Sequence, residues 1–263
     1  QRGTQYINSI GWMNILDQIL DVKRQEVGQI QNTEFGDLVE QTRSLKDALS
    51  KPGISIIAEI KMKSPSEGEI LPNADPVQIA KEYESAGATA ISVLTDEQFF
   101  GGSLESLTAV RKAVSIPVIR KDFIIDTKQI SESVQHNADA FLLIADALSQ
   151  DTLQQLMNDG KDAGLESIVE YHAEEHAEFI FVLNPDIVGI NCRNLQTMDT
   201  DISYFEKLVS SLPSSSIKVA ESGIHTSNDL NYVSGLGYDA ALIGTSLIKT
   251  GNPGKALETL LGG

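Results

Sequence analysis

Eight short apolar runs recur along this chain, and they limit its possible fold more than any other feature. Their starts lie roughly 26 positions apart, the length of one strand followed by one helix. Runs that are apolar throughout are typical of strands buried on both faces of a parallel sheet. The runs are Ile54–Ile60, Ala88–Leu94, Ile116–Arg120, Asp139–Ile144, Leu165–Glu170, Asp186–Ile190, Ile217–Ala220 and Asp239–Ile243.

The segments between these runs carry helix signals. Asp75-Pro76 supplies a cap and a first-turn proline, and Ala86-Gly87 ends the same helix. Asp126 and Thr226 are two further predicted N-caps. Eight strand–helix units in about 210 residues predict an α/β fold, a closed (β/α)8 TIM barrel over residues 54–263. An open, doubly wound sheet is the structural alternative.

Residues 13–53 are predicted to form an N-terminal helical segment of the barrel domain. A helix is expected from Met13 to about Ile30, because Ile15, Leu16, Ile19, Leu20 and Val27 recur at helical spacing. A second, short helix is expected from about Phe35 to Leu49, ended by Lys51-Pro52-Gly53. We interpret residues 1–12 as an extension or a cloning remnant, with Met13 as the natural start.

Charge and composition exclude several classes of protein. The net charge of −17 argues against binding to nucleic acid or to an anionic membrane surface. No run approaches the roughly 18 apolar residues of a membrane helix. The single cysteine, Cys192, allows neither an internal disulfide nor a Cys-rich metal site, and favours a cytoplasmic location. A pocket for an anion in so acidic a chain requires basic residues to be concentrated locally.

Polar and charged residues follow the predicted strands where a TIM barrel places its functional side chains. Alternation along the first run directs Glu59, Lys61 and Lys63 to the barrel mouth, with Ile60 and Met62 toward the helices. One such charge is usually a solvated loop residue or part of a rim ion pair, but six strand ends share this property. The other five carry Arg120-Lys121-Asp122-Phe123, Glu170, Asn191-Cys192-Arg193-Asn194, Glu221-Ser222-Gly223 and Gly244-Thr245-Ser246.

Two glycine-containing loops near the C-terminus predict a phosphate site. Glycine lets the backbone approach a ligand, and free N–H groups at a helix start attract a phosphate. Ser222-Gly223 and Gly244-Thr245 follow the last two predicted strands, where barrels often bind phosphate. Lys63 and Ser64 would close this site from the first loop. An ordinary turn is the alternative interpretation of each glycine.

Several of these stretches together resemble the indole-3-glycerol phosphate synthase family from Met13 to Leu261. The most specific are Lys61-x-Lys63-Ser64-Pro65-Ser66 and Lys121-Asp122-Phe123, in this order on one barrel. Further matching stretches are 57–60, 92–96, 99–103, Val169-Glu170, 189–191, 193–195, 220–224 and 243–247. Other phosphate-binding barrels share the last two loops but lack the lysine motifs.

The resemblance implies a lyase of tryptophan biosynthesis. Its substrate would be 1-(2-carboxyphenylamino)-1-deoxyribulose 5-phosphate, converted to indole-3-glycerol phosphate with loss of carbon dioxide and water, without cofactor or metal. By position, Lys121 matches the general acid, Glu170 the base of the dehydration, and Lys61 the lysine that holds the substrate carboxylate or acts as the dehydration acid. The remaining polar positions of the catalytic set are Glu59, Asn191 and Glu221.

The resemblance also implies the substrate contacts. Arg193 matches an arginine near the substrate carboxylate. Phe100 and Phe123 would pack the anthranilate ring, although a role in the core is as plausible for Phe123. The phosphate contacts would come from Lys63, Ser64, Ser222, Gly223, Gly244 and Thr245. As partners we expect a small phosphorylated substrate and no nucleic acid or membrane. We expect a monomer, and association with other tryptophan-pathway enzymes is left open.

Three competing interpretations remain open. The segment from His172 to His176 fits an H-x-x-E-H zinc motif, but it starts directly after a predicted strand, where solvated residues are favoured. Lys121 at a strand end would also suit a Schiff-base aldolase. A barrel that only binds phosphate is the third, and the intact catalytic set argues against it. Cys192 is expected to pack, and His136 and His225 are expected to be structural or exposed.

Overall fold

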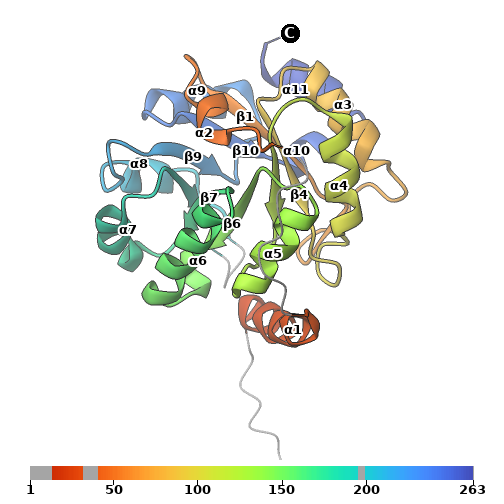
Figure 1. The fold of residues 1–263 in the computed structure, drawn as a ribbon. Coiled ribbons are helices and arrows are strands. Elements are labelled where there is room, and N and C mark those ends of the chain that lie inside the picture. The colour runs from red at the N-terminus through yellow and green to blue at the C-terminus, as the bar shows by residue number, and fades with distance from the viewer. Residues whose placement is uncertain (1–13, 32–40, 195–198, 263) are drawn as a thin grey trace, which may run out of the picture.

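The computed structural model describes residues 14–31, 41–194 and 199–262. Eight parallel strands form a closed barrel in the order β1-β10-β9-β8-β7-β6-β5-β4, and helices surround it (Figure 1). The predicted (β/α)8 barrel is therefore confirmed, and the open sheet is excluded because β1 pairs with both β4 and β10. The barrel strands are β1 Ser55–Ile60, β4 Ala90–Leu94, β5 Val118–Lys121, β6 Ala140–Ile144, β7 Glu166–Tyr171, β8 Ile187–Asn191, β9 Ile217–Glu221 and β10 Ala240–Ile243.

The helices begin at the residues that the sequence predicts. Asp75, Asp126 and Thr226 each accept a backbone N–H bond at the start of a helix, so the three predicted caps are confirmed. The helices of the barrel are α3 Pro76–Ser85, α4 Leu104–Ala113, α5 Thr127–Gln135, α6 Gln150–Asp162, α7 Ala177–Leu183, α8 Tyr204–Val209, α9 Ser227–Gly235, α10 Thr245–Ile248 and α11 Pro253–Leu260. Single 3₁₀ turns occupy Ala145–Ala147 and Glu174–His176.

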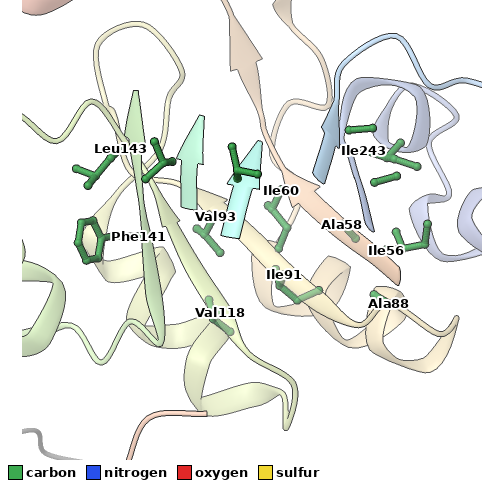
Figure 2. Close-up of a cluster of buried hydrophobic side chains, with 14 of the residues drawn as sticks. Ile56, Ala58, Ile60, Ala88, Ile91, Val93, Val118, Phe141, Leu143 and Ile243 are labelled. Atoms are coloured by element: carbon green, nitrogen blue, oxygen red, sulfur yellow. The ribbon is translucent and has the colours of Figure 1, made fainter. Parts of the chain in front are cut away.

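Strand residues alternate between two apolar clusters. Ile56, Ala58 and Ile60 of β1 face outward to the helices, together with Ile91 and Val93 of β4 (Figure 2). The residues between them, such as Ile57 and Ala90, belong to a separate cluster inside the barrel. Because alternate side chains point to opposite faces of a strand and both faces are buried, most residues of the barrel strands are apolar. The charged side chains of the strands lie mainly near the strand ends, as Glu59 of β1, Lys121 of β5 and Glu221 of β9 do.

Two N-terminal helices cover opposite ends of the barrel (Figure 1). α1, Ile15–Gln29, packs Leu16, Ile19 and Leu20 into the inner cluster beside Phe123, which follows the C-terminal end of β5. α2, Leu45–Leu49, lies at the N-terminal end of the strands, where its cap residue Ser44 donates to Glu166 at the start of β7. The N-terminal segment thus contacts both ends of the barrel.

Two details differ from the sequence-based expectation. Of the helix predicted for 35–49, residues 35–40 lie outside the described part of the chain, and 41–44 are not helical because the backbone of Arg43 is held by the Asp139 carboxylate. A two-stranded hairpin of β2, Lys63–Ser64, and β3, Gly68–Glu69, was not predicted, because strands of two residues leave no periodic pattern. The predicted extension at residues 1–12 also lies outside the described residues.

Candidate active site

One pocket opens at the C-terminal end of the barrel strands. It encloses about 990 Å³ when the open solvent at its mouth is included. All six predicted catalytic residues line it, and they come from five strands or the loops directly after them. They are Glu59, Lys61, Lys121, Glu170, Asn191 and Glu221. Residues up to 162 positions apart in the sequence are therefore brought to one small volume, as the barrel topology predicts.

Lys121 lies at the centre of a buried ionic cluster. Its Nζ donates to Glu170 Oε2 at 2.7 Å and to Glu221 Oε2 at 2.9 Å. Glu170 also accepts a bond from Asn191 Nδ2 at 2.9 Å. Burial alone would lower the pKa of Lys121, but the charges of Glu170, Glu221 and Glu59 raise it above its ordinary value. Lys121 is thereby kept as an ammonium.

The two carboxyl groups beside Lys121 differ in protonation. Burial and the neighbouring charge of Glu170 raise the pKa of Glu221 well above its ordinary value. Glu170 is equally buried, but Lys121 and hydrogen bonds from Glu221, Lys121 and Asn191 lower its pKa. Two carboxyl groups this close share a proton instead of both ionising. The proton of the pair is therefore favoured on Glu221 and the negative charge on Glu170.

Two glycines give the carboxyl groups the room they occupy. A Cβ on Gly189 of β8 would lie 2.2 Å from Glu221 Oε1, and one on Gly244 would lie 2.6 Å from Glu59 Oε1. Glu59 in turn forms an ion pair of 2.8 Å with Lys61. Glycine weakens the interior of a strand and often marks a close approach of another group. Here that group is a catalytic-site carboxyl.

Two aromatic rings form an apolar wall of the pocket. Phe100 and Phe123 both line it, with ring centroids 6.0 Å apart and planes inclined by 35°. Phe123 also packs in the inner apolar cluster, so its possible role in the core is confirmed, and its contact with an anthranilate ring stays a prediction. Leu142, Ile144 and Leu242 are among the other apolar residues of the lining. A planar aromatic group fits such a surface.

The two glycine loops also reach the pocket. Ser222, Gly223, Gly244 and Thr245 all line it. Ser222 and Gly223 have positive φ angles of 71° and 70°, and for serine this conformation is strained. α9 starts only at Ser227, so this loop stands clear of the helix start and presents its own backbone to the pocket.

The comparisons with known proteins agree on one family. The family model described as indole-3-glycerol phosphate synthase matches residues 16–260. A protein of that name from Halalkalibacterium halodurans is 43% identical over 252 residues, covering 95% of this chain and 97% of the relative. Another from Geobacillus sp. (strain WCH70) is 47% identical over 89% of this chain and 92% of the relative. The chain belongs to the indole-3-glycerol phosphate synthase family.

Solved structures resemble the chain in fold alone. A structure of the tryptophan synthase a2b2 complex from Pyrococcus furiosus matches with a TM-score of 0.61 at 13% identity, covering 79% of this chain and 98% of that chain. Thiamine phosphate pyrophosphorylase from the same organism matches with a TM-score of 0.59 at 15% identity, covering 83% and 96%. The barrel is thus common to several proteins and does not by itself identify a function.

Within this synthase-family pocket, one predicted contact residue stands apart. Ser64 and Arg193 line the pocket, and Arg193 donates to Ser66 Oγ at 3.3 Å. Lys63 is absent from the lining, because its Nζ extends to the backbone carbonyl of Gln98 at 3.2 Å. Its side chain is exposed, at the rim beside Gly101. A phosphate contact by Lys63 stays a prediction.

The synthase-family pocket does not contain the local excess of basic residues that the acidic composition of the chain led us to expect. Its described lining has three cationic side chains, Lys61, Lys121 and Arg193, against four carboxyl groups. Asp122, one of the four, is already paired with cations behind the pocket wall. Anion binding therefore depends on individual cations and backbone N–H groups rather than on net charge.

Several lining residues were missed by sequence reasoning. His225 and Ser66 line the pocket, and each sits one or two positions from a predicted contact residue. A fuller reading of the loops at 64–66 and 222–225 would have included them. Most apolar lining residues leave no such signal, because their side chains resemble any other strand residue of a TIM barrel.

The two histidines of the possible zinc motif make other contacts within this synthase-family chain. His172 Nδ1 lies 2.8 Å from the carbonyl of Asn191, and its ring stacks on Tyr204. His176 Nε2 lies 3.8 Å from Asp146 Oδ1. Among the residues that the structure describes, no group of three His, Cys, Asp or Glu side chains could hold a metal ion. The pattern H-x-x-E-H is accounted for by packing contacts.

Proposed function

We propose that this chain catalyses the ring closure of 1-(2-carboxyphenylamino)-1-deoxyribulose 5-phosphate to indole-3-glycerol phosphate, with loss of carbon dioxide and water. The family it belongs to supports this reaction. The observation that carries the assignment is the Lys121 ammonium bonded to both Glu170 and Glu221 in one pocket with Lys61. This is a set of proton donors and acceptors that an acid–base condensation needs.

The first step forms a carbon–carbon bond. The ring carbon that bears the carboxylate attacks the ribulose carbonyl, and the carbonyl oxygen gains negative charge. Lys121 donates a proton to this oxygen, because its raised pKa keeps it charged until the acceptor becomes strongly basic. Loss of carbon dioxide then restores the aromatic ring.

The second step removes the new hydroxyl group as water. It needs a base for the proton that is lost and an acid for the leaving hydroxyl. Glu170, held ionised by Lys121 and Asn191, takes the role of the base. Lys61 or Lys121 takes the role of the acid, and Glu59 at 2.8 Å orients Lys61. No step of this chemistry calls for electrons from a cofactor.

Three regions of the pocket suit three parts of the substrate. We assign the anthranilate ring to the wall of Phe100 and Phe123. The substrate carboxylate is assigned to Lys61 and Arg193. The phosphate is assigned to the backbone of the loops at 222–223 and 244–245 with Ser64, and Lys63 joins it from the rim.

A Schiff-base aldolase is the second candidate, because a lysine ends β5 in a pocket suited to sugar phosphates. That chemistry requires a neutral amine as nucleophile. The carboxyl groups around Lys121 raise its pKa, which disfavours the neutral form. The ionic cluster therefore favours the acid–base assignment.

A fluorescence assay tests the proposed function. The purified protein is incubated with the anthranilate-derived substrate in the presence of a chelator, and the indole fluorescence of the product is followed. We expect turnover that chelator does not reduce. Absence of product, or a borohydride-trapped adduct on Lys121 with a keto-sugar phosphate, would contradict the assignment.

We also propose a cellular setting for this chain. In the described residues, no helix has both the length and the apolar character to cross a membrane. We propose that the chain acts in the cytoplasm as a monomer, with access to other tryptophan-pathway enzymes. The single cysteine, Cys192, supports a reducing compartment, because the chain forms no internal disulfide.

A further inference from the structure

A buried lysine of the N-terminal helix contacts the loops that carry the pocket residues. Lys23 of α1 is 2% exposed. Its Nζ lies 3.0 Å from Asp96 Oδ2 and 2.9 Å from Asp122 Oδ1, and it also reaches Glu26 at 2.7 Å. Asp96 follows β4 and Asp122 follows β5, so one ammonium joins α1 to two adjacent strand ends.

Each of the two aspartates organises a loop that lines the pocket. Asp96 Oδ1 accepts the backbone N–H of Phe99 at 2.7 Å and that of Phe100 at 3.2 Å. Asp122 Oδ1 accepts the N–H of Phe123 at 2.8 Å. The two rings of the aromatic wall are therefore attached to the two carboxylates that Lys23 holds together.

The ion pair between Lys23 and Asp122 also lies next to the proposed general acid, Lys121. Asp122 directly follows Lys121 in the chain. Asp122 Oδ2 accepts bonds from Thr95 Oγ1 at 2.6 Å and Arg120 Nη2 at 3.2 Å, so the carboxylate is fixed on both oxygens. Among the described residues, Asp96 pairs with Lys23 and with no second cation, and it is fully buried. Removal of Lys23 would leave it uncompensated, and its loop would have to move toward water.

We propose that Lys23 is a positioning residue for the reaction: it sets the separation of the loops after β4 and β5, and with it the placing of Phe100, Phe123 and Lys121. This inference rests on the proposed function. It gives the N-terminal helix a task in catalysis besides covering the barrel, since a misplacement of about 1 Å lowers turnover substantially.

The test compares two buried cations at opposite ends of the barrel. Lys23→Met removes the ammonium at the pocket end. Arg111→Met removes the guanidinium that pairs with Asp139 at 2.8 Å near the start of the strands, equally buried and remote from the pocket. We expect both variants to melt earlier. Only Lys23→Met should lower kcat/KM, by about 10- to 100-fold, through a higher KM and a lower kcat.

Two further variants keep the result interpretable. Lys23→Arg preserves the charge and should recover kcat/KM to within about fivefold of the unmodified protein. Asp96→Asn keeps the acceptor for Phe99 and Phe100 but removes one ion pair, and should raise KM without unfolding the chain. If kcat and KM are unchanged in folded Lys23→Met and in Asp96→Asn, Lys23 is structural only and the proposal is wrong.

A substrate-free measurement separates this proposal from the proposed function. Hydrogen exchange of the free enzyme should show faster exchange at the amides of Phe99, Phe100 and Phe123 in Lys23→Met but not in Arg111→Met. Unchanged protection of these amides would overturn the proposal even if the enzyme is active. If the unmodified protein forms no indole product, the proposed function fails, while the exchange result still reports on the loops.

Discussion

The two ends of the barrel bury charges in different ways. At the N-terminal end, Asp139 is surrounded by donors: Arg111, the backbone N–H of Val118 and the backbone N–H of Arg43. Glu166 likewise accepts from Ser44 Oγ and the N–H of Lys46. These carboxylates join α2 and the residues just before it to the strand starts, and they do not belong to the lining of the pocket at the other end. Their bonds stabilise the fold.

The carboxyl groups at the C-terminal end are held less completely. Glu221 is 1% exposed, and its Oε1 has no hydrogen-bond partner in the part of the chain that is described. Lys121 is shared between two carboxyl groups, one of which keeps its proton. A buried polar atom without a partner is costly and calls for an explanation, of which a catalytic role is one. The difference teaches that the charges at the N-terminal end are paired for stability, whereas Lys121 and its two carboxyl groups at the C-terminal end are arranged to exchange protons.

The largest expected effect comes from removing the central acid or base. Lys121→Ala or Glu170→Gln should lower kcat by about 10²- to 10⁴-fold, because each loses a proton-transfer group. Circular dichroism and thermal melting should show a folded protein, since both side chains line the pocket and neither belongs to an apolar cluster of the barrel. Near-normal turnover in both variants would refute the assigned roles.

The matching change at the other end should alter stability instead. Asp139→Asn should lower the free energy of unfolding by about 3 kcal/mol, because Arg111 loses its buried counter-charge. Urea unfolding measures this loss. kcat/KM, measured where the variant is folded, should stay within twofold of the unmodified protein. A large loss of activity would mean that the two ends are not separable.

A pH titration of stability tests the buried ion pairs of Asp122 with Arg120 and Lys23. Burial alone would raise the pKa of Asp122, but the charges of Arg120 and Lys23 and bonds from Thr95 and Lys23 hold this pKa at about 2. A lowered pKa contributes stability that is complete above the unfolded value near 4 and is lost as pH falls toward 2. Unfolding free energies at pH 5 and pH 2.5 should differ by about 2 kcal/mol more in the unmodified protein than in Asp122→Asn. An equal pH dependence would show that Asp122 is not the group involved.

The substitution Gly189→Ala tests how closely Glu221 packs against β8. Gly189→Ala places a Cβ 2.2 Å from Glu221 Oε1, so the carboxyl must move away from Lys121. We expect kcat to fall about tenfold. Gly235→Ala at the end of α9 is the control, because a Cβ there meets no atom within 4 Å. Equal activities in these two variants would show that the position of Glu221 is unimportant.

The smallest expected effect concerns the rim. Lys63→Ala should raise KM about threefold with little change in kcat, because an exposed contact to phosphate contributes alike to the ground and transition states. Steady-state kinetics decide this. A fall in kcat alone would place Lys63 among the groups that act on the reacting atoms.

Much of the fold follows from periodic sequence features. All eight strands lie within two residues of the predicted runs, and Asp75, Asp126 and Thr226 cap their helices, because buried strands and caps leave local signals. The six predicted catalytic residues share one pocket for the same reason: a barrel gathers the residues that end its strands.

Other features depend on contacts far apart in the sequence. Glu221 keeps its proton because of Glu170 and burial, which no local pattern encodes. The strained φ of Ser222 leaves no signal either. Lys23 did leave a signal in the sequence. It falls on the apolar face of α1 with Leu16, Ile19, Leu20 and Val27, where a lysine requires a buried partner.

The central claim is that the C-terminal end of the barrel holds the substrate between its aromatic wall and its ionic cluster. A crystal structure with a bound substrate analogue, whose carbonyl is reduced to a hydroxyl so that the ring cannot close, tests it directly. We expect the phosphate against the backbone at 222–223 and 244–245, the ring against Phe100 and Phe123, and the hydroxyl oxygen within hydrogen-bond distance of Lys121 Nζ. An analogue bound elsewhere, or with this hydroxyl turned away from Lys121, would contradict the claim.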